Sequence, residues 1–400
     1  MKTLYLCYYG VREPLVQTQV LPYLRQLVAA GIEVSLLTFE PQFGRRWTEE
    51  ALANQAARLA GEGIRWRCRA YHKSPSAPAT AYDILAGAWV AARLARRFKI
   101  DVLHARSHVP VAMALLARTL TGCRLVFDVR GLWAEEYVDI GNWAEGSPPF
   151  RAIKKLERVG LRKADQVVVL THRMRDWLVG ERLADAGKIS VIPCCTDVSR
   201  FAEESPADAD AAPRFEIVYA GTATGLHLLE EVGQFFLKLR AHRADAFLRV
   251  LTHSPSAEVA TIFGRVGLSP DDYWIGAVEP AEVPKYFRRA RAGVSFRKAT
   301  FAQIAASPAK IPEYLAAGLP VIFNAGVGDM DDLLEKESVG LVLKELDDAA
   351  YEQAARRLVS LVETPEIRER CREVARRYFD LEQVGGAGYL KVYRRISDTL

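Results

Sequence analysis

Short, nearly continuous runs of apolar residues alternate with longer amphipathic stretches along the first half of the chain. Runs rich in Val, Leu and Ile that do not alternate with polar residues are typical of parallel strands covered on both faces. The stretches between the runs, for example 17–31 and 82–98, have the length of helices that connect parallel strands. In this half the pattern predicts strands at 3–9, 33–39, 101–106, 124–129, 166–171 and 189–194.

The pattern stops at 202–214 and then starts again. Residues 202–214 are rich in Ala, Pro and Asp and contain no aromatic residue, which predicts a linker. The closing stretch 389–400 is amphipathic and predicts a helix that crosses back to the first domain. The expected organisation is therefore an N-terminal domain at 1–201, a linker at 202–214, a C-terminal domain at 215–380 and a closing helix within 381–400. Strands of the second half are predicted at 215–221, 247–252, 273–278, 292–297, 320–325 and 339–344.

Two halves built this way predict an α/β protein with two tandem Rossmann-like domains that face each other across a cleft. A chain of 400 residues is also long enough for two cores. Open parallel sheets bind ligands beyond the carboxyl ends of their strands. Functional residues are therefore expected directly after the predicted strands.

Composition narrows the class of protein. No apolar run reaches the roughly 18–20 residues that span a membrane, and the opening MKTLYLCYYG reads as a strand and not as a signal peptide. The six cysteines show no CxxC spacing, so neither a disulfide framework nor a metal site is expected. We expect a cytoplasmic protein without a cofactor.

Charge is divided unevenly between the halves. Residues 1–200 carry 29 Lys and Arg against 19 Asp and Glu, a balance of +10, whereas the remainder has 25 against 30. The basic residues cluster at 65–69, 93–99 and 151–163. Such clusters suit phosphates, an anionic membrane surface or nucleic acid, and they also suit plain solvated helix faces. Because no nucleic-acid-binding motif accompanies them, nucleic acid is not expected as a partner.

The segment SPAKIPEYLAAGLPVIFNAGVGD at 307–329 predicts a helix followed by a buried strand. Ser307 is the expected N-cap, Pro308 the first helical residue and Gly318 the residue just past the end. Lys310 and Glu313 then share one face near the positive end of the helix dipole. A lysine at that end suggests that an anion binds there. The alternative is an ordinary surface ion pair.

Three segments together resemble a known family: DVLHARS at 101–107, the stretch from ADQVVVLTHRMRDWL to KISVIPCCTDVSRF, and SPAKIPEYLAAGLPVIFNAGVGD. Their order and spacing resemble GT-B glycosyltransferases, and more narrowly the retaining group called family 4. The resemblance implies transfer of a hexosyl unit from a nucleotide diphosphate sugar to a hydroxyl acceptor, with retention and without a metal.

The resemblance also implies a donor site in the second domain. Glu313 would accept hydrogen bonds from the ribose hydroxyls, and Lys310 with the N–H groups after Ser307 would hold the diphosphate. Two family features are missing: Ala305 stands where many members have a sugar-binding glutamate, for which Gln303 or Ser307 are nearby substitutes. The usual Arg and Lys after the first strand of this domain are also absent. Donor candidates at the strand ends are therefore Gly221, Thr222, Arg297 and Lys298.

Candidates in the first domain follow its fourth and fifth predicted strands. Arg106 ends the run DVLHAR and suits a phosphate or acceptor anion, because arginine binds oxygens in pairs. His104 is a weaker catalytic candidate that also fits a partly buried strand-end histidine, and His108 is weaker still. Asp128 is our choice for an acceptor-side base or orienting group.

The stretch FDVRGLWAEEYVD at 127–139 places acids beside aromatic rings, a combination that suits sugar hydroxyls and the apolar face of a pyranose. A capped helix start with exposed acids is the plain alternative. A second loop, GVREPLVQTQ, replaces the glycine-rich first loop of the family. Candidates for the acceptor or for loop contacts are Gln17, Thr18, Arg130, Trp133 and Glu135.

Other functions fit the same fold. A nucleotide-sugar epimerase or hydrolase would keep the donor site, and an inactive nucleotide-sugar-binding paralogue would explain the two missing family features. The basic first half leaves open a peripheral contact with the inner face of a membrane and an anionic or membrane-associated acceptor. The sequence names neither the nucleotide, the sugar, the acceptor nor the oligomeric state.

Overall fold

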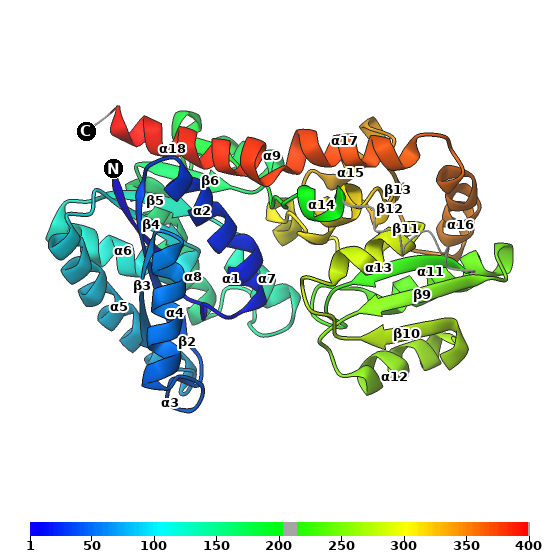
Figure 1. Cartoon of the computed structure of the whole chain (residues 1–400), viewed down its shortest axis with the longest axis horizontal. Coiled ribbons are helices and arrows are strands. Elements are labelled where there is room, and N and C mark those ends of the chain that lie inside the picture. The colour runs from blue at the N-terminus through cyan, green and yellow to red at the C-terminus, as the bar shows by residue number, and fades with distance from the viewer. Residues whose placement is uncertain (203–213, 399–400) are drawn as a thin grey trace. The chain divides into compact units, whose positions relative to one another are not determined.

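The computed structural model describes residues 1–202 and 214–398. The chain divides into two compact units, Met1–Pro193 together with Leu381–Leu400, and Cys194–Asp380 (Figure 1). Residues 194–201, which the sequence pattern assigned to the first domain, thus group with the second unit. The predicted linker 202–214 lies almost entirely outside the described residues.

Unit 1 is built on a fully parallel sheet. Its seven described strands have the order β3-β2-β1-β4-β5-β6-β7. The order reverses direction between β1 and β4, which is the switch point of a Rossmann-like sheet. The predicted α/β class and Rossmann-like topology are confirmed for this unit. The strands are β1 (Lys2–Cys7), β2 (Glu33–Glu40), β3 (Ile64–Ala70), β4 (Val102–Arg106), β5 (Arg124–Asp128), β6 (Gln166–Val169) and β7 (Ile189–Val191).

Strand β3 was not predicted, because its sequence IRWRCRA alternates apolar residues with arginines and was interpreted only as a basic cluster. The alternation is that of an edge strand, which pairs with β2 alone. Its Trp66 is buried and its ring lies 5.5 Å from that of Trp47. Two of the three basic clusters, by contrast, lie on helices.

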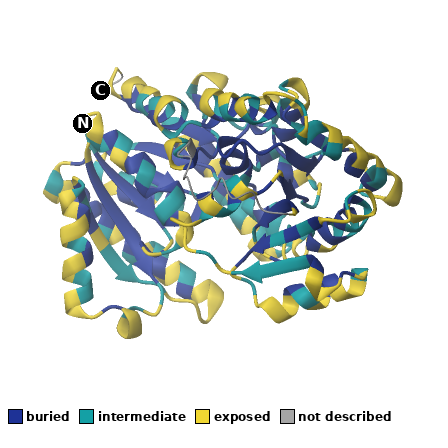
Figure 2. Ribbon diagram, turned by 45° about the vertical axis from the view of Figure 1, so that its right-hand side comes forward, coloured by how far each residue is buried: buried dark blue, intermediate teal, exposed yellow. Residues whose placement is uncertain are grey.

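Helices cover both faces of the first sheet, and their apolar sides form its core. Figure 2 shows burial concentrated on the strands and exposure on the outward sides of many helices. The longest helix, α5, is almost devoid of acids, and α5 and α6 pack side by side. The helices from residue 14 to 180 are α1 (Pro14–Gln19), α2 (Leu21–Ala29), α3 (Phe43–Arg46), α4 (Glu49–Gly61), α5 (Ser76–Phe98), α6 (His108–Thr121), α7 (Trp133–Asp139), α8 (Pro148–Lys163) and α9 (His172–Gly180).

The last helix, α18 (Ala387–Ser397), belongs to unit 1 and follows a π-helical segment, Leu381–Gly386. It lies beside α2 and β7 (red in Figure 1). The approach is close, since a Cβ on Gly388 would lie 3.1 Å from Ile192 and one on Gly386 would lie 3.0 Å from Gln26. Small residues at these two positions therefore let the end of the chain pack into the first core.

Unit 2 repeats the plan with six described parallel strands in the order β10-β9-β8-β11-β12-β13. Its switch point lies between β8 and β11. The core includes Phe235, Phe236, Phe263 and Phe296, all fully buried. The strands are β8 (Phe215–Ala220), β9 (Ala246–Leu251), β10 (Tyr273–Gly276), β11 (Ala292–Ser295), β12 (Val321–Asn324) and β13 (Gly340–Leu343).

The helices of unit 2 connect these strands. The short helix α10 packs Phe201 onto Phe287 of α13, with ring centroids 6.0 Å apart. No helix in the described part of the chain has both the length and the apolarity that crossing a membrane would need. The helices are α10 (Ser199–Ala202), α11 (Leu229–His242), α12 (Ser256–Val266), α13 (Val283–Arg289), α14 (Lys310–Ala316), α15 (Met330–Lys336), α16 (Asp348–Val362) and α17 (Ile367–Phe379).

Candidate functional site

The carboxyl ends of three neighbouring strands of unit 2 bring polar groups to one edge of the sheet. Gly221 follows β8, Arg297 comes two residues after β11, and Asn324 ends β12. These strands flank the switch point, where a Rossmann-like sheet opens for a ligand. Tyr314 of α14 ties the helix to the same place, because its hydroxyl accepts the Ala220 N–H at 2.7 Å.

Arg297 is held at several points. Its Nε donates to Gln303 Oε1 at 3.0 Å, and its Nη1 lies 3.4 Å from His227 Nε2. Its backbone N–H donates to Asn324 Oδ1 at 2.8 Å, and Asn324 Nδ2 donates back to the Arg297 carbonyl at 3.0 Å. The guanidinium, which is partly exposed, is therefore a pre-oriented positive charge.

His227 stays neutral beside this arginine. Burial, together with the positive charge of Arg297, lowers the pKa of His227 to about 4. A neutral ring offers Nε2 as the acceptor for Arg297. Gly221 makes room for this contact, since a Cβ there would lie 2.9 Å from the Tyr219 hydroxyl and 3.4 Å from the His227 ring.

Gln303 is fully buried, on the 3-10 turn Phe301–Ala305. Its Oε1 accepts from Arg297, while its Nε2 has no hydrogen-bond partner among the described residues. A buried amide donor without a partner costs roughly 1–3 kcal/mol, which a bound ligand oxygen would recover. Gln303 thus lies next to Arg297, whereas Ala305 is buried and apolar.

The structure of the segment 307–318 differs from the sequence prediction at the start of the helix. Helix α14 begins at Lys310 with Ala309 at its N-cap, so Ser307 is not the cap. The Ser307 hydroxyl instead accepts the N–H of Cys194 at 3.0 Å. The N–H of Ile311 bonds to the Pro308 carbonyl at 3.1 Å, so it is not available to an anion.

Gly318 lies just past the helix with φ 79°, as predicted. Lys310 Nζ and Glu313 Oε2 lie 2.8 Å apart and form the ion pair that was the plain alternative. Glu313 is nearly buried and Lys310 is about one-third exposed. The pair thus keeps an accessible ammonium group beside a shielded carboxylate.

Thr222 and Lys298 lie on the loops around Arg297. Thr222 is exposed, its hydroxyl donates to the Thr224 carbonyl at 3.2 Å, and its own carbonyl accepts from the Tyr219 hydroxyl. The Lys298 N–H donates to the Leu226 carbonyl at 2.9 Å, which joins its loop to that of His227. The structure therefore groups Gly221, Thr222, Arg297 and Lys298 at one sheet edge, and it pairs Lys310 with Glu313.

In unit 1 the candidates Asp128, Arg106 and His104 do meet, but in the interior. Arg106 and Asp128 are register partners on β4 and β5. Asp128 Oδ2 lies 3.7 Å from both Arg106 Nη1 and His104 Nε2, and Asp128 Oδ1 lies 3.6 Å from Arg130 Nη1. All but Arg130 are almost fully buried, and the Arg130 side chain is 10% exposed.

The closing helix covers this cluster. The Tyr389 hydroxyl donates to Asp128 Oδ2 at 2.9 Å, and the Tyr393 hydroxyl lies 2.9 Å from His104 Nδ1. Burial opposes the charge of Asp128, yet Arg130, His104 and Arg106 outweigh it and hold the pKa of Asp128 below its usual range. Burial also lowers the pKa of His104. The cluster therefore contains one carboxylate between two guanidinium groups and a neutral imidazole, and its solvent side is closed by tyrosines.

The remaining first-domain candidates engage neighbouring groups. Gln17 Nε2 donates to the Val11 carbonyl, and the Thr18 hydroxyl donates to the Pro14 carbonyl at 2.9 Å. Trp133 lies in an aromatic group with Tyr137 and Trp143, at centroid distances of 5.4 and 5.8 Å.

Glu135 pairs with Lys154 at 2.7 Å. Lys154 also reaches Glu157, which contacts His108 at 3.1 Å. In the stretch 127–139 the structure thus pairs Glu135 with a lysine and groups Trp133 with other aromatic rings.

Sequence reasoning missed several of these roles. His227 and Asn324 position Arg297, and only the polar residue closing the buried run PVIFNA hinted at Asn324. Glu40 was also missed. Its buried carboxylate accepts the Val11 N–H at 2.9 Å and fixes the loop after β1, while burial raises the pKa of Glu40.

Two parallel Rossmann-like sheets, each with alternating helices, define the class of protein, the GT-B fold. Sucrose-phosphate synthase from Thermosynechococcus elongatus is 16% identical, with a TM-score of 0.75 and all of both chains covered. HepE from Anabaena in complex with UDP-glucose is 14% identical, with a TM-score of 0.67. The match covers all of this chain and 99% of that chain. A "putative UDP-N-acetylglucosamine 2-epimerase" from Listeria monocytogenes is 13% identical, with a TM-score of 0.63, and the match covers 100% of this chain and 96% of that chain.

The family comparison agrees with the fold. Residues 16–195 match the family model described as a glycosyl transferase 4-like domain. None of the curated proteins matches the sequence. The resemblance to GT-B glycosyltransferases that the sequence motifs predicted is thereby confirmed.

Proposed function

We propose that the protein is a retaining glycosyltransferase that moves a hexosyl unit from a nucleotide diphosphate sugar to a hydroxyl acceptor, without a metal. The observation that carries the proposal is the Arg297 group, a pre-oriented guanidinium at the switch point of the second sheet. A diphosphate leaving group gains negative charge as the sugar–phosphate bond breaks. A fixed cation stabilises that charge more in the transition state than in the ground state.

The second unit offers groups for the diphosphate, the sugar and the ribose of a donor. Arg297 and Lys298 would meet the diphosphate, with Gly221 and Thr222 letting it approach the backbone. The partnerless Nε2 of Gln303 would donate to a sugar hydroxyl or a phosphate oxygen. Glu313 would accept from the ribose hydroxyls, with Lys310 turning from its present ion pair to the diphosphate.

Our proposal names fewer residues for the acceptor than for the donor. Arg106 and Asp128 are buried, so in our proposal they support the sheet edge and do not touch the acceptor. The aromatic group of Trp133 with Glu135 remains the candidate for acceptor contacts, because rings and carboxylates suit sugars. The acceptor class includes a glycan, a lipid-linked sugar or a small molecule.

The experiment is calorimetric titration with UDP, GDP, ADP and dTDP, followed by transfer assays with the matching sugar donors. UDP comes first, because HepE was solved with UDP-glucose. Arg297→Gln and Glu313→Ala should weaken binding of the one favoured diphosphate. Arg356→Gln, which removes an exposed arginine of the same unit, is the matched control. Binding that is equal in Arg297→Gln and wild type would count against this site.

A nucleotide-sugar epimerase or hydrolase is the second candidate, favoured by the fold shared with the Listeria epimerase. It predicts an epimerised or free sugar in the absence of any acceptor. An inactive nucleotide-sugar-binding paralogue predicts binding without either product. The same preparation separates the three functions by product analysis.

A further inference from the structure

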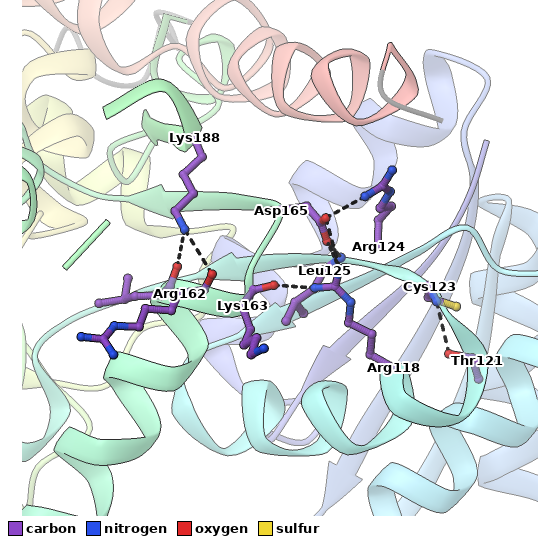
Figure 3. A network of polar contacts seen from close by, with 10 residues as sticks. Arg118, Thr121, Cys123, Arg124, Leu125, Arg162, Lys163, Asp165 and Lys188 are labelled. Atoms are coloured by element: carbon purple, nitrogen blue, oxygen red, sulfur yellow. Dashed lines mark hydrogen bonds and ion pairs between the residues drawn. The ribbon is translucent and has the colours of Figure 1, made fainter. Parts of the chain in front are cut away.

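Helices α5, α6 and α8 form a continuous layer on one face of the first sheet. Arg96 Nη2 of α5 donates to the Leu120 carbonyl of α6 at 2.8 Å. Arg118 of α6 donates to the Lys163 carbonyl at the end of α8 (Figure 3). A Cβ on Gly160 of α8 would lie 3.3 Å from Val111 of α6. The outward residues of the three helices are therefore neighbours and form what we name the α5–α6–α8 face.

Large apolar side chains stand on this face. Tyr82, Leu85 and Trp89 are 54%, 65% and 59% exposed. Their spacing of three and four residues puts them on one stripe of α5. Leu116 and Leu120 of the adjoining α6 are also exposed. Contiguous exposed apolar side chains mark an interaction surface, whereas single ones need no explanation.

The charge of the face has one sign. The three helices, every residue of which is described, contain ten Lys and Arg and two acids, Asp83 and Glu157. Both acids are fully buried and paired inside, Asp83 with His72 at 2.6 Å and Glu157 with His108 at 3.1 Å. The exposed cations are Arg93, Arg96, Arg97, Arg151, Lys155, Arg158, Arg162 and Lys163.

The acid next to the end of α8 is neutralised as well. Asp165 pairs with Arg118 and Arg124, each at 3.0 Å, and accepts the Leu125 N–H at 2.8 Å (Figure 3). Lys188 donates to the Leu161 carbonyl at 2.7 Å and so caps the end of α8 with a further positive charge. The positive potential therefore continues across this end of the face.

We propose that the α5–α6–α8 face docks on an anionic membrane surface. Trp89, Tyr82 and Leu85 would enter the interfacial region of the bilayer, where aromatic side chains with a polar edge are stable. The surrounding arginines and lysines would contact lipid phosphates while their alkyl stems lie on apolar groups. The proposal deepens the acceptor side of the proposed function, because it would bring the enzyme to a membrane-associated acceptor.

Two other occupants fit less well. In a symmetric contact with a second copy, the same cations would face one another, which is repulsive. A nucleic acid would satisfy the cations, yet it would leave Leu85, Leu116 and Leu120 without apolar partners. A bilayer surface satisfies both parts of the face.

The test is sedimentation of the full chain with vesicles of phosphatidylcholine alone and of phosphatidylcholine with phosphatidylglycerol. The charge variant Arg93→Gln/Arg96→Gln/Arg97→Gln should bind the anionic vesicles on the order of 100-fold more weakly. The apolar variant Leu85→Ser/Trp89→Ser, whose charge is unchanged, should bind at least about tenfold more weakly. The control Arg265→Gln/Arg356→Gln/Arg357→Gln, with the same charge change on exposed arginines of unit 2, should bind as wild type.

Several results would overturn the proposal. They are no sedimentation of the wild type, equal weakening by the control, or unchanged binding of the apolar variant. Vesicle-free dimers that Leu85→Ser/Trp89→Ser disrupts would assign the face to a second copy, and heparin binding insensitive to that variant would assign it to a polyanion. Thermal melts of each variant verify folding. Nucleotide diphosphate titration of the same variants is independent of the face, so failure there concerns the proposed donor site alone.

Discussion

The two sheet edges of this chain have the same topology and different surroundings. Beyond β4 and β5, Asp128, Arg106 and His104 are buried under the tyrosines of α18. Beyond β8 and β11, Arg297 is partly exposed and is held by neutral or polar partners. In the first group one carboxylate lies between two guanidinium groups beneath tyrosine side chains, whereas in the second the arginine side chain is partly exposed at the sheet edge. A charged cluster at a switch point is therefore a better candidate for a ligand site where its side chains stay partly exposed.

The variant with the largest expected effect on stability is Asp128→Asn, which removes the carboxylate from between Arg106 and Arg130. Leaving buried guanidinium groups without their counter-ion should lower the free energy of unfolding by about 3–5 kcal/mol. Urea denaturation measures the loss, and Asp176→Asn on an exposed turn of α9 is the control. Unchanged stability combined with lost transfer activity would instead return Asp128 to a catalytic role.

Arg297→Gln should have a smaller effect, and on binding instead of stability. Loss of charged hydrogen bonds to a phosphate is worth roughly 1.5–3 kcal/mol, or about ten- to 100-fold in the dissociation constant of the diphosphate. Calorimetry measures the constant, and the unfolding free energy should change by less than about 1 kcal/mol. A large loss of stability without a change in binding would make Arg297 structural, like Asp128.

Tyr389→Phe tests the cover over the first cluster. It removes one hydrogen bond to a buried carboxylate and should cost about 1–2 kcal/mol of unfolding free energy. Tyr23→Phe, which removes a 3.3 Å hydroxyl contact to the Pro193 carbonyl beside the same helix, serves as the matched change and should cost less. Equal losses in the two variants would mean that the contact to Asp128 carries no special weight.

The smallest expected effect is the pH dependence of stability that His227 contributes. The pKa of His227 is lowered from 6.5 to about 4 on folding, so the unfolded chain takes up this proton first. Stability from this group is fully present above pH 6.5 and decreases as the pH falls towards 4. Urea denaturation at pH 7.5 and at pH 5.5 should show a loss that is about 1 kcal/mol larger in wild type than in His227→Gln. Parallel curves for the two proteins would contradict a neutral His227.

Much of the fold could be predicted because parallel strands buried on both faces appear in the sequence as continuous apolar runs. Runs such as TLYLCYY and QVVVLT have no polar alternation, and they are strands β1 and β6. Strand β3 was missed because arginines alternate with Trp66 and Cys68, so it has no continuous apolar run. The other edge strands, β7, β10 and β13, do have apolar runs and were predicted.

The candidate sites were harder to predict, because burial depends on distant residues. Arg106 and Asp128 follow their strands as ligand-binding residues do, and only Tyr389 and Tyr393, more than 250 positions later, reveal the cover. Ser307 looked like a helix cap, yet a partner more than 100 residues away takes its hydroxyl. Arg297 was found from its strand end, whereas the neutral state of His227 depends on its surroundings in three dimensions.

The return of α18 to the first unit has a consequence for synthesis on the ribosome. The tyrosines that cover Asp128 lie more than 250 residues after the strands that carry the charges. The residues of unit 2 lie between the two in the sequence, so they are translated before this cover is made. The first core is thus completed only after the second unit has been translated.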